Sequence, residues 1–248
     1  MEYISSRKNS IIQHVRSLAK DRSYRKENNE YLCDGWKLLE EAREHGCTIT
    51  SVIWKDKAEN SIPEVEKQYV VPADLFDYAS PMKNSPGPLF TVTMEPAEEG
   101  LYNQAVILEN VQDPGNVGTV IRTANAMNIP AVILCGDCAD QYHPRTVRAS
   151  MGAVFRQKVY SISDTSQIKK IITGKLYGAA LSDSSVDVRT MNLTGCSVAI
   201  GNEGNGLSQE LIELCDELVI IPMNANSESL NASAAATVLM WEMARNNL

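Results

Sequence analysis

Three segments in the second half of the chain repeat one pattern, and this repetition constrains the fold more than any other feature. The segments span residues 110–134, 198–211 and 219–245. Each combines a strand-like apolar run, a loop rich in Gly, Asn, Pro and Ser, and a helix-like run, in that order. Parallel strands of an α/β protein end at one edge of the sheet, so we expect the three polar loops to gather there and form an active site.

The same alternation continues through the rest of the chain beyond residue 101. Apolar runs predict strands at 105–109, 131–135, near Val159, and at 176–181, 197–201 and 218–222. Helical patterns follow Gly115, surround Arg145, cover 168–172, start at Ser208 and close the chain. Strands that alternate with helices predict an α/β domain with a mostly parallel sheet covered on both faces.

The first part of the chain predicts a smaller α/β unit. Apolar residues at helical spacing predict helices over 10–18 and 36–44, and short β-like runs lie at 50–54, 69–71 and 89–93. The segment 80–88 is dense in Pro, Gly and Ser, and 94–100 is acidic and turn-like. We therefore expect two domains, at residues 1–96 and 101–248.

Composition limits how this chain can meet a nucleic acid. The 248 residues are 44% hydrophobic, enough for real cores, and the formal net charge is -8 with a pI near 5.0. Such a chain does not coat itself in nucleic acid through bulk electrostatics, so a polyanion must be met locally. A local basic excess lies in the first 30 residues, for which a solvated helix face is the alternative interpretation.

Two absences in the sequence bear on the location of the protein, and the distribution of its cysteines bears on their redox state. No apolar segment approaches the roughly 20 residues needed to span a bilayer, and the N-terminus lacks the apolar core of a signal peptide. Six cysteines are scattered through a large chain, which suits reduced thiols better than a disulfide framework. We expect a cytoplasmic protein without a membrane partner.

The first loop carries a candidate anion receptor. Asn116 lies where a helix begins, and Arg122 lies off the buried stripe of that helix. Helical side chains lean toward the N-terminus, so Arg122 points back over Gly118, where the missing side chain leaves room. A guanidinium beside helix N-terminal amides suits a phosphate or a developing oxyanion. A surface arginine after a tight turn is the alternative.

The other two loops add a carboxylate and a helix start. Glu203 follows a buried strand within the glycine-rich segment 201–206, which matches neither a P-loop nor a dinucleotide-binding fingerprint. Ser229 is a natural N-cap for the last helix, and that structural role alone would explain it. The small residues of this helix suit either a tight internal fold or a subunit interface.

Together the motifs N-x-x-D-P-G-N-x-G-x-x-x-R, G-N-E-G-x-G-L-S and I-P-M-x(5)-S-L-N, in this order and strand context, closely resemble the signature motifs of the SpoU (TrmH) branch of the SPOUT RNA methyltransferases. The resemblance covers residues 101–248. A weaker similarity links residues 4–42 to the small RNA-binding domain that many members carry ahead of the methyltransferase domain.

This resemblance implies methyl transfer from S-adenosylmethionine to a ribose 2′-hydroxyl of structured RNA. It also implies a deep trefoil knot in the C-terminal domain and a homodimer formed through that domain. The N-terminal domain resembles that of rRNA-modifying members, which favours 23S rRNA over tRNA. The target nucleotide stays open.

The resemblance also carries over site residues. The polar catalytic set is Asn116, Arg122, Glu203, Ser229 and Asn231, and the backbone groups that hold the cofactor belong to Gly201, Ile221 and Leu230. Candidate RNA-binding residues are Arg7, Lys8, Arg22, Arg25, Lys26, Arg145 and Arg148. A guanidinium is a poor proton acceptor, so we predict that Arg122 orients the RNA phosphate and stabilises negative charge, with Glu203 and Asn116 holding it in place.

The sequence departs from the family pattern at two positions, and two other functions are alternatives. Ala225 stands where the family usually has glycine, and Asp34-Gly35 stands where a Glu-Gly pair is expected. An RNA-binding protein without catalysis is one rival, which the intact polar set disfavours. A thiol redox protein using Cys135 and Cys138 is the other, and it requires a depressed cysteine pKa. We expect no metal site, because the histidines are isolated and no second C-x-x-C pair exists.

Overall fold

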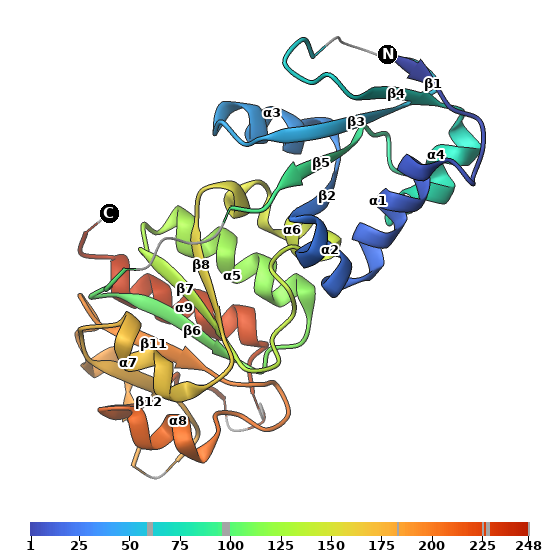
Figure 1. The fold of residues 1–248 in the computed structure, drawn as a ribbon. Coiled ribbons are helices and arrows are strands. Elements are labelled where there is room, and N and C mark those ends of the chain that lie inside the picture. Colours follow the sequence, from blue (N-terminus) through green and yellow to red (C-terminus); the bar gives the residue numbers. More distant parts are fainter. Residues whose placement is uncertain (59–61, 96–99, 183, 225, 227–228, 248) are drawn as a thin grey trace. The chain divides into compact units, whose positions relative to one another are not determined.

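A computed structural model describes the chain except for residues 59–61, 96–99, 183, 225, 227–228 and 248 (Figure 1). The chain divides into two compact units: Met1–Pro96 with Tyr142–Phe155, and Ala97–Gln141 with Arg156–Leu248. The sequence-based division left Tyr142–Phe155 in the second unit. In the structure, Val147 of this segment belongs to an apolar cluster of the first unit, which explains the difference.

The first unit is a mixed five-stranded sheet with the order β1-β4-β3-β5-β2. β4 pairs in parallel with β1 and β3, while β5 pairs antiparallel with β3 and β2. The strands are β1 (Glu2–Tyr3), β2 (Glu30–Asp34), β3 (Ile49–Lys55), β4 (Gln68–Val71) and β5 (Leu89–Thr93). The sequence predictions for β3, β4 and β5 are confirmed, and β1 and β2 are additions.

Helices cover both faces of this sheet because alternate strand residues point to opposite sides. Leu32, Ile53 and Leu89 pack with helices α1 (Ser10–Lys20) and α4 (Ala73–Ala79). Their neighbours Cys33, Trp54 and Phe90 pack on the other face with α3 (Trp36–Glu44) and with Val147 of α6 (Pro144–Ser150). The remaining helix, α2 (Arg22–Asn28), begins where the Asp21 carboxylate accepts the Ser23 and Tyr24 backbone N–H groups.

The second unit is a seven-stranded sheet with the order β10-β12-β9-β11-β6-β7-β8, and every recorded strand pair is parallel. The strands are β6 (Ala105–Glu109), β7 (Ala131–Cys135), β8 (Lys158–Ile162), β9 (Leu176–Ala179), β10 (Val186–Asp187), β11 (Ser197–Ile200) and β12 (Glu217–Ile220). All residues of β6, β7 and β11 are buried, as expected for strands covered on both faces. The predicted mostly parallel α/β fold is confirmed.

The strand order contains a reversal that matters for the site. From β6 the chain moves outward through β7 to β8, and then returns to β9 and β11 on the other side of β6. Ligands of open α/β sheets bind outside the carboxyl ends of the strands at such a reversal. The helices of this unit are α5 (Pro114–Ala126), α7 (Ile168–Ile171), α8 (Gln209–Leu214) and α9 (Ala232–Ala244), with short 3-10 turns between strands.

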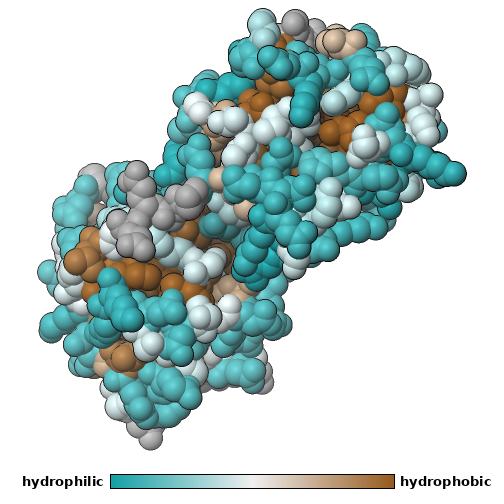
Figure 2. Space-filling model, in the orientation of Figure 1, coloured by the Kyte–Doolittle hydropathy of each residue, from teal (hydrophilic) through white to brown (hydrophobic). Residues whose placement is uncertain are grey.

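The described residues contain no helix with the length and hydropathy that a membrane crossing requires. On the face shown in Figure 2, hydrophilic side chains cover most of each unit, and each unit also has smaller apolar patches.

Candidate active site

A cavity of about 530 Å³ lies at the carboxyl ends of three neighbouring strands of the second unit. The last residues of β9, β11 and β12, Ala179, Ile200 and Ile220, line it together with the loops that follow β11 and β12. The cavity thus lies outside the carboxyl ends of the strands, as is usual in open α/β sheets, on β9, β11 and β12 and next to the reversal between β6 and β11. Gly201, Glu203, Ile221, Ser229 and Leu230, which the sequence analysis selected from two separate loops, all line this cavity.

A chain of hydrogen bonds joins the three loops beside this cavity. The Asn116 side chain donates from Nδ2 to Glu203 Oε1 at 2.6 Å. Ser233 Oγ, at the start of α9, donates toward Asn116 Oδ1 at 3.1 Å and lies 2.6 Å from Asn231 Oδ1. We call Asn116, Glu203, Asn231 and Ser233 the loop network. It contains three of the five predicted polar residues, and it adds Ser233, which the sequence analysis treated only as a small packing residue.

The loop that carries Glu203 is a tight hairpin held by its own backbone. Asn202 and Gly206 exchange two backbone hydrogen bonds, and Asn202 Oδ1 accepts the N–H groups of Gly204 and Asn205. Glu203 is exposed at the tip. A side chain at Gly201 would meet the Gly206 carbonyl carbon at 2.1 Å, so this glycine is required by the hairpin closing on itself rather than by a ligand alone.

Two residues that the sequence analysis missed anchor this hairpin to β6. The buried Glu109 carboxylate accepts the Ser208 backbone N–H at 2.7 Å and its hydroxyl at 2.6 Å, and Ser208 caps α8. Asn202 Nδ2 donates to the Asn110 carbonyl at 2.9 Å. A charged residue at the end of the apolar run 105–109 was the available signal, because a buried carboxylate needs donors.

Arg122 stands apart from the loop network. It is exposed on α5 and makes no hydrogen bond or ion pair with any residue that the structure describes. Neither Glu203 nor Asn116 holds it, contrary to the prediction. Gly118 is buried in the same helix, so the room expected above it is not open. An exposed guanidinium without a protein partner retains all its donors for an anionic ligand.

The last helix starts later than predicted. Its N-cap is Asn231, whose Oδ1 accepts the N–H groups of Ser233 and Ala234, and the helix runs from Ala232. Ser229 is therefore not the N-cap; it is exposed on the cavity wall. An asparagine satisfies the same orphan N–H groups as a serine does, so the cap moved by two residues. Ala225 lies outside the described residues.

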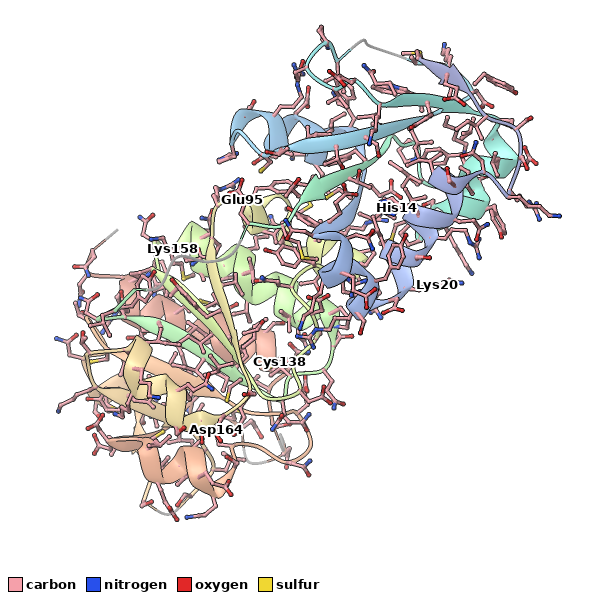
Figure 3. All side chains as sticks on the ribbon, viewed as in Figure 1. His14, Lys20, Glu95, Cys138, Lys158 and Asp164 are labelled. Atoms are coloured by element: carbon pink, nitrogen blue, oxygen red, sulfur yellow. The ribbon has the colours of Figure 1, made fainter. Side chains whose placement is uncertain are left out.

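The thiols near β7 do not have the properties of a redox pair. Burial raises the pKa of Cys135 to about 12 and that of Cys138 to about 11, the opposite of the depressed pKa that a reactive thiol needs. Cys138 lies inside the second unit (Figure 3), and its Sγ donates to the Leu108 carbonyl at 3.2 Å. Among the residues described, no group of three or more His, Cys, Asp or Glu side chains is placed to hold a metal ion.

The basic residues predicted to bind RNA all fall in the first unit, since Tyr142–Phe155 brings Arg145 and Arg148 there. Six of the seven are exposed: Arg7, Lys8, Arg22, Lys26, Arg145 and Arg148. Arg25 is the exception and that prediction is wrong. It is only 2% exposed, and its Nη1 donates to the Leu18 carbonyl at 2.6 Å, so it holds α1 and α2 together.

Comparison with known proteins assigns the family. The sequence profile of the SpoU rRNA Methylase family matches residues 103–241, and that of the MRM3-like substrate binding domain matches residues 9–88. The first match spans more than half of the chain and contains the cavity and the loop network. The chain therefore belongs to the SpoU rRNA methylase family.

Individual relatives match over nearly the full length. The 23S rRNA (guanosine(2553)-2′-O)-methyltransferase RlmP of Bacillus subtilis is 29% identical, with 98% of this chain and 99% of that protein covered. The AdoMet-bound rRNA methyltransferase from Sinorhizobium meliloti has a TM-score of 0.85 at 26% identity, covering 99% and 98% of the two chains. The SpoU methyltransferase AviRb from Streptomyces viridochromogenes, in complex with AdoMet, has a TM-score of 0.84 at 26% identity, covering 96% and 98%.

Proposed function

We propose that this chain transfers a methyl group from S-adenosylmethionine to a ribose 2′-hydroxyl of 23S rRNA. The observation that carries the proposal is the loop network at the rim of the 530 Å³ cavity, in a chain of the SpoU rRNA methylase family. Full-length relatives named as 23S rRNA 2′-O-methyltransferases support the choice of substrate.

The residues that line the cavity fit S-adenosylmethionine. Aliphatic side chains of Ala179, Ile200 and Val219 offer an apolar wall for the adenine ring. Ile221 and Leu230 lie outside helices and strands, so their backbone groups are free of a ladder and available to the polar parts of the ligand. Gly201, Ile221 and Leu230 would hold this cofactor, which supplies an electrophilic methyl group on a sulfonium.

The chain's own residues then have to position the ribose and balance charge. In-line displacement requires the attacking 2′-hydroxyl to be held in one direction, and charge on its oxygen grows as its proton leaves. Hydrogen bonds fix Asn116, Glu203 and Asn231 relative to one another, so these polar groups are oriented before RNA arrives. We assign to Arg122 the RNA phosphate and the developing negative charge, and to Ser229 a contact with the bound substrate.

RNA is held mainly by the first unit in this proposal. Its support is the match of residues 9–88 to a substrate binding domain, together with the exposed residues Arg7, Lys8, Arg22, Lys26, Arg145 and Arg148. These cations lie on a chain of net charge -8, so they give a local rather than a global attraction for phosphate.

We further propose a homodimer formed through the C-terminal domain, a trefoil knot in that domain and a cytoplasmic location, as the family resemblance implies. We place the dimer contact on α9. Support for the dimer comes from Val238 and Trp241, two large apolar side chains that are 38% and 51% exposed on α9. Light scattering on the purified protein should give twice the mass of one chain. The Trp241→Glu variant should give the mass of a single chain.

Mapping ribose methylation across total RNA from cells with and without the gene tests the function. We expect one 2′-O-methyl group of 23S rRNA to disappear with the gene. A lost site in tRNA instead would overturn the choice of substrate. No lost site, together with no heat of S-adenosylmethionine binding in calorimetry, would assign the chain to RNA binding without catalysis.

A further inference from the structure

We propose that a second pocket, in the first unit, seats one unpaired nucleotide of the RNA substrate, with its phosphate at Arg16 and Lys20. Neither residue was among the predicted RNA-binding set. The inference rests on the proposed function, because it assumes that the chain acts on RNA. It adds a defined subsite in the first unit, whereas methyl transfer is proposed in the second.

The pocket has a volume of about 310 Å³ and is built from three separate parts of the chain. Arg16, Ala19 and Lys20 come from α1, residues 78–82 from the end of α4 and the loop after it, and residues 143–145 from the start of α6. None of the residues that line it is acidic, although the chain carries 31 acidic and 23 basic residues. A concave site with cations and no carboxylate selects an anionic ligand.

The cationic side of this pocket is preorganised. The Arg16 guanidinium lies 3.6 Å from the centroid of the Tyr78 ring, and its Nη1 donates to the Tyr78 carbonyl at 2.6 Å. Arg7 lies 4.5 Å from the same centroid. Two like charges gathered on one ring repel each other, and a bound phosphate would relieve that repulsion.

Lys20 supplies a charge that the protein does not use. It is exposed at the C-terminal end of α1 (Figure 3) and makes no ion pair with any described residue. Such an ammonium remains available for phosphate, which lysine binds as a point charge.

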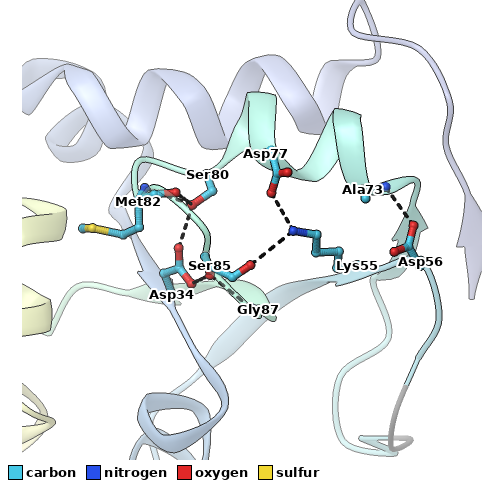
Figure 4. Close-up of polar contacts among 9 residues, drawn as sticks. All are labelled: Asp34, Lys55, Asp56, Ala73, Asp77, Ser80, Met82, Ser85 and Gly87. Carbon is cyan, nitrogen blue, oxygen red and sulfur yellow. Dashed lines mark hydrogen bonds and ion pairs between the residues drawn. The ribbon is translucent and has the colours of Figure 1, made fainter.

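A part-buried hydrogen-bond cluster fixes residues 80–82, which line the pocket (Figure 4). Ser80 Oγ donates to Asp34 Oδ2 at 2.7 Å and accepts the Met82 backbone N–H at 3.0 Å, and Ser85 Oγ donates to Asp34 Oδ1. Asp34 therefore holds residues 80–82 in place from beneath. A wall that is ordered before binding lowers the entropy cost of seating a ligand.

Part of the pocket lining is apolar. Ala19, Ala79, Pro81, Met82 and Pro144 line it together with the cationic residues. A free phosphate ion would use only the cationic residues, whereas a nucleotide would use both parts, with its base or ribose on the apolar surface. Its volume is at the lower end of the range for small-ligand pockets, which suits one nucleotide rather than a helix.

The test uses the full-length protein and unmodified 23S rRNA transcribed in vitro. Lys20→Glu should weaken RNA binding about tenfold or more and reduce the slope of log affinity against log salt by about one. Ala19→Leu, which fills the pocket without changing charge, should weaken binding with no change in that slope. Lys37→Glu is the matched control, because Lys37 is exposed on α3 and does not line the pocket.

The outcomes separate this inference from the proposed function. If the wild-type protein methylates RNA but Lys20→Glu binds it as tightly as Lys37→Glu does, the inference is overturned and the function stands. Normal binding by Ala19→Leu would overturn the seating of a nucleotide. Competition by AMP without any effect of Lys20→Glu on RNA affinity would assign the pocket to a free nucleotide and overturn the RNA subsite. Absence of RNA methylation by the wild-type protein would instead contradict the proposed function.

Discussion

The two units each contain a polar cluster, and the clusters differ in exposure and in the distance along the chain that they connect. The loop network of the second unit joins residues 116, 203, 231 and 233 in exposed or partly exposed positions beside a cavity. In the first unit, the Asp34 cluster joins a strand end to Ser80 and to the buried Ser85.

This difference separates a site built for a ligand from one built for the fold. In the Asp34 cluster, hydroxyl donors satisfy both carboxylate oxygens. These hydrogen bonds stabilise the loop that carries Ser80 and Ser85. In the loop network, Glu203 accepts one bond at Oε1, and Arg122, on the same helix as Asn116, makes no hydrogen bond or ion pair with any described residue. Groups left exposed with spare hydrogen-bonding capacity are the ones that a substrate can use.

The largest expected effect is at Arg122. Arg122→Ala should lower kcat for methyl transfer by about a thousandfold, because a donor aimed at developing charge is removed. The midpoint of thermal unfolding should change little, since the exposed side chain makes no described hydrogen bond or ion pair. Arg122→Lys should recover only part of the rate, because lysine lacks the planar fork. A rate near wild type in either variant would contradict the role assigned to the guanidinium.

Glu203→Gln should have the next largest effect. The glutamine can still accept the bond from Asn116 Nδ2, so the hairpin geometry is kept and only the charge is lost. We expect kcat to fall about a hundredfold with little change in S-adenosylmethionine affinity by calorimetry. If the affinity for the cofactor falls instead and kcat holds, Glu203 belongs to the binding site and not to the methyl-transfer step.

The sequence predicted the strands and loops of this site, but not the contacts between segments that are far apart in the chain. Buried apolar runs at 105–109 and 131–135 predict the parallel strands because both faces of the sheet are covered. The bond between Ser233 and Asn116 links positions 117 apart, and no periodicity within either segment encodes it. The association of Tyr142–Phe155 with the first unit depends on Val147 finding a core far away in sequence. Helix starts were misjudged where Asn and Ser compete as caps, as at Ser229.

In the first unit, Asp34→Ala should change stability and not chemistry. It leaves the hydroxyls of Ser80 and the buried Ser85 without their acceptor, which should cost about 2 kcal/mol in the free energy of unfolding. Denaturant titration measures this cost, and kcat at saturating RNA should hold. A large fall in kcat with unchanged stability would contradict the claim that the Asp34 cluster serves the fold and not the reaction.

The smallest expected effect is a pH dependence at Glu30. Its carboxylate lies 2.8 Å from His14 Nε2, and this hydrogen bond holds the pKa of Glu30 below its ordinary value of 4.5. Since the folded pKa is the lower one, the stabilisation is present above pH 4.5 and is lost as pH falls through the folded pKa.

Glu30→Gln should therefore cost about 1 kcal/mol near neutral pH and almost nothing in strong acid. Asp34 has the opposite sign: burial raises its pKa, so acidification through that raised pKa stabilises the folded state relative to the unfolded chain. Measuring the unfolding free energies of Glu30→Gln and Asp34→Ala against pH tests both signs. If the two losses of stability changed with pH in the same direction, one of the two assignments would be wrong.

The most direct measurement is a crystal structure of the protein with S-adenosylmethionine. We predict the cofactor in the cavity between Gly201, Ile221 and Leu230, with its methyl group facing the loop network. A cofactor bound elsewhere, or one whose methyl group faces away from Asn116 and Glu203, would contradict the central claim that these loops form a methyl-transfer site.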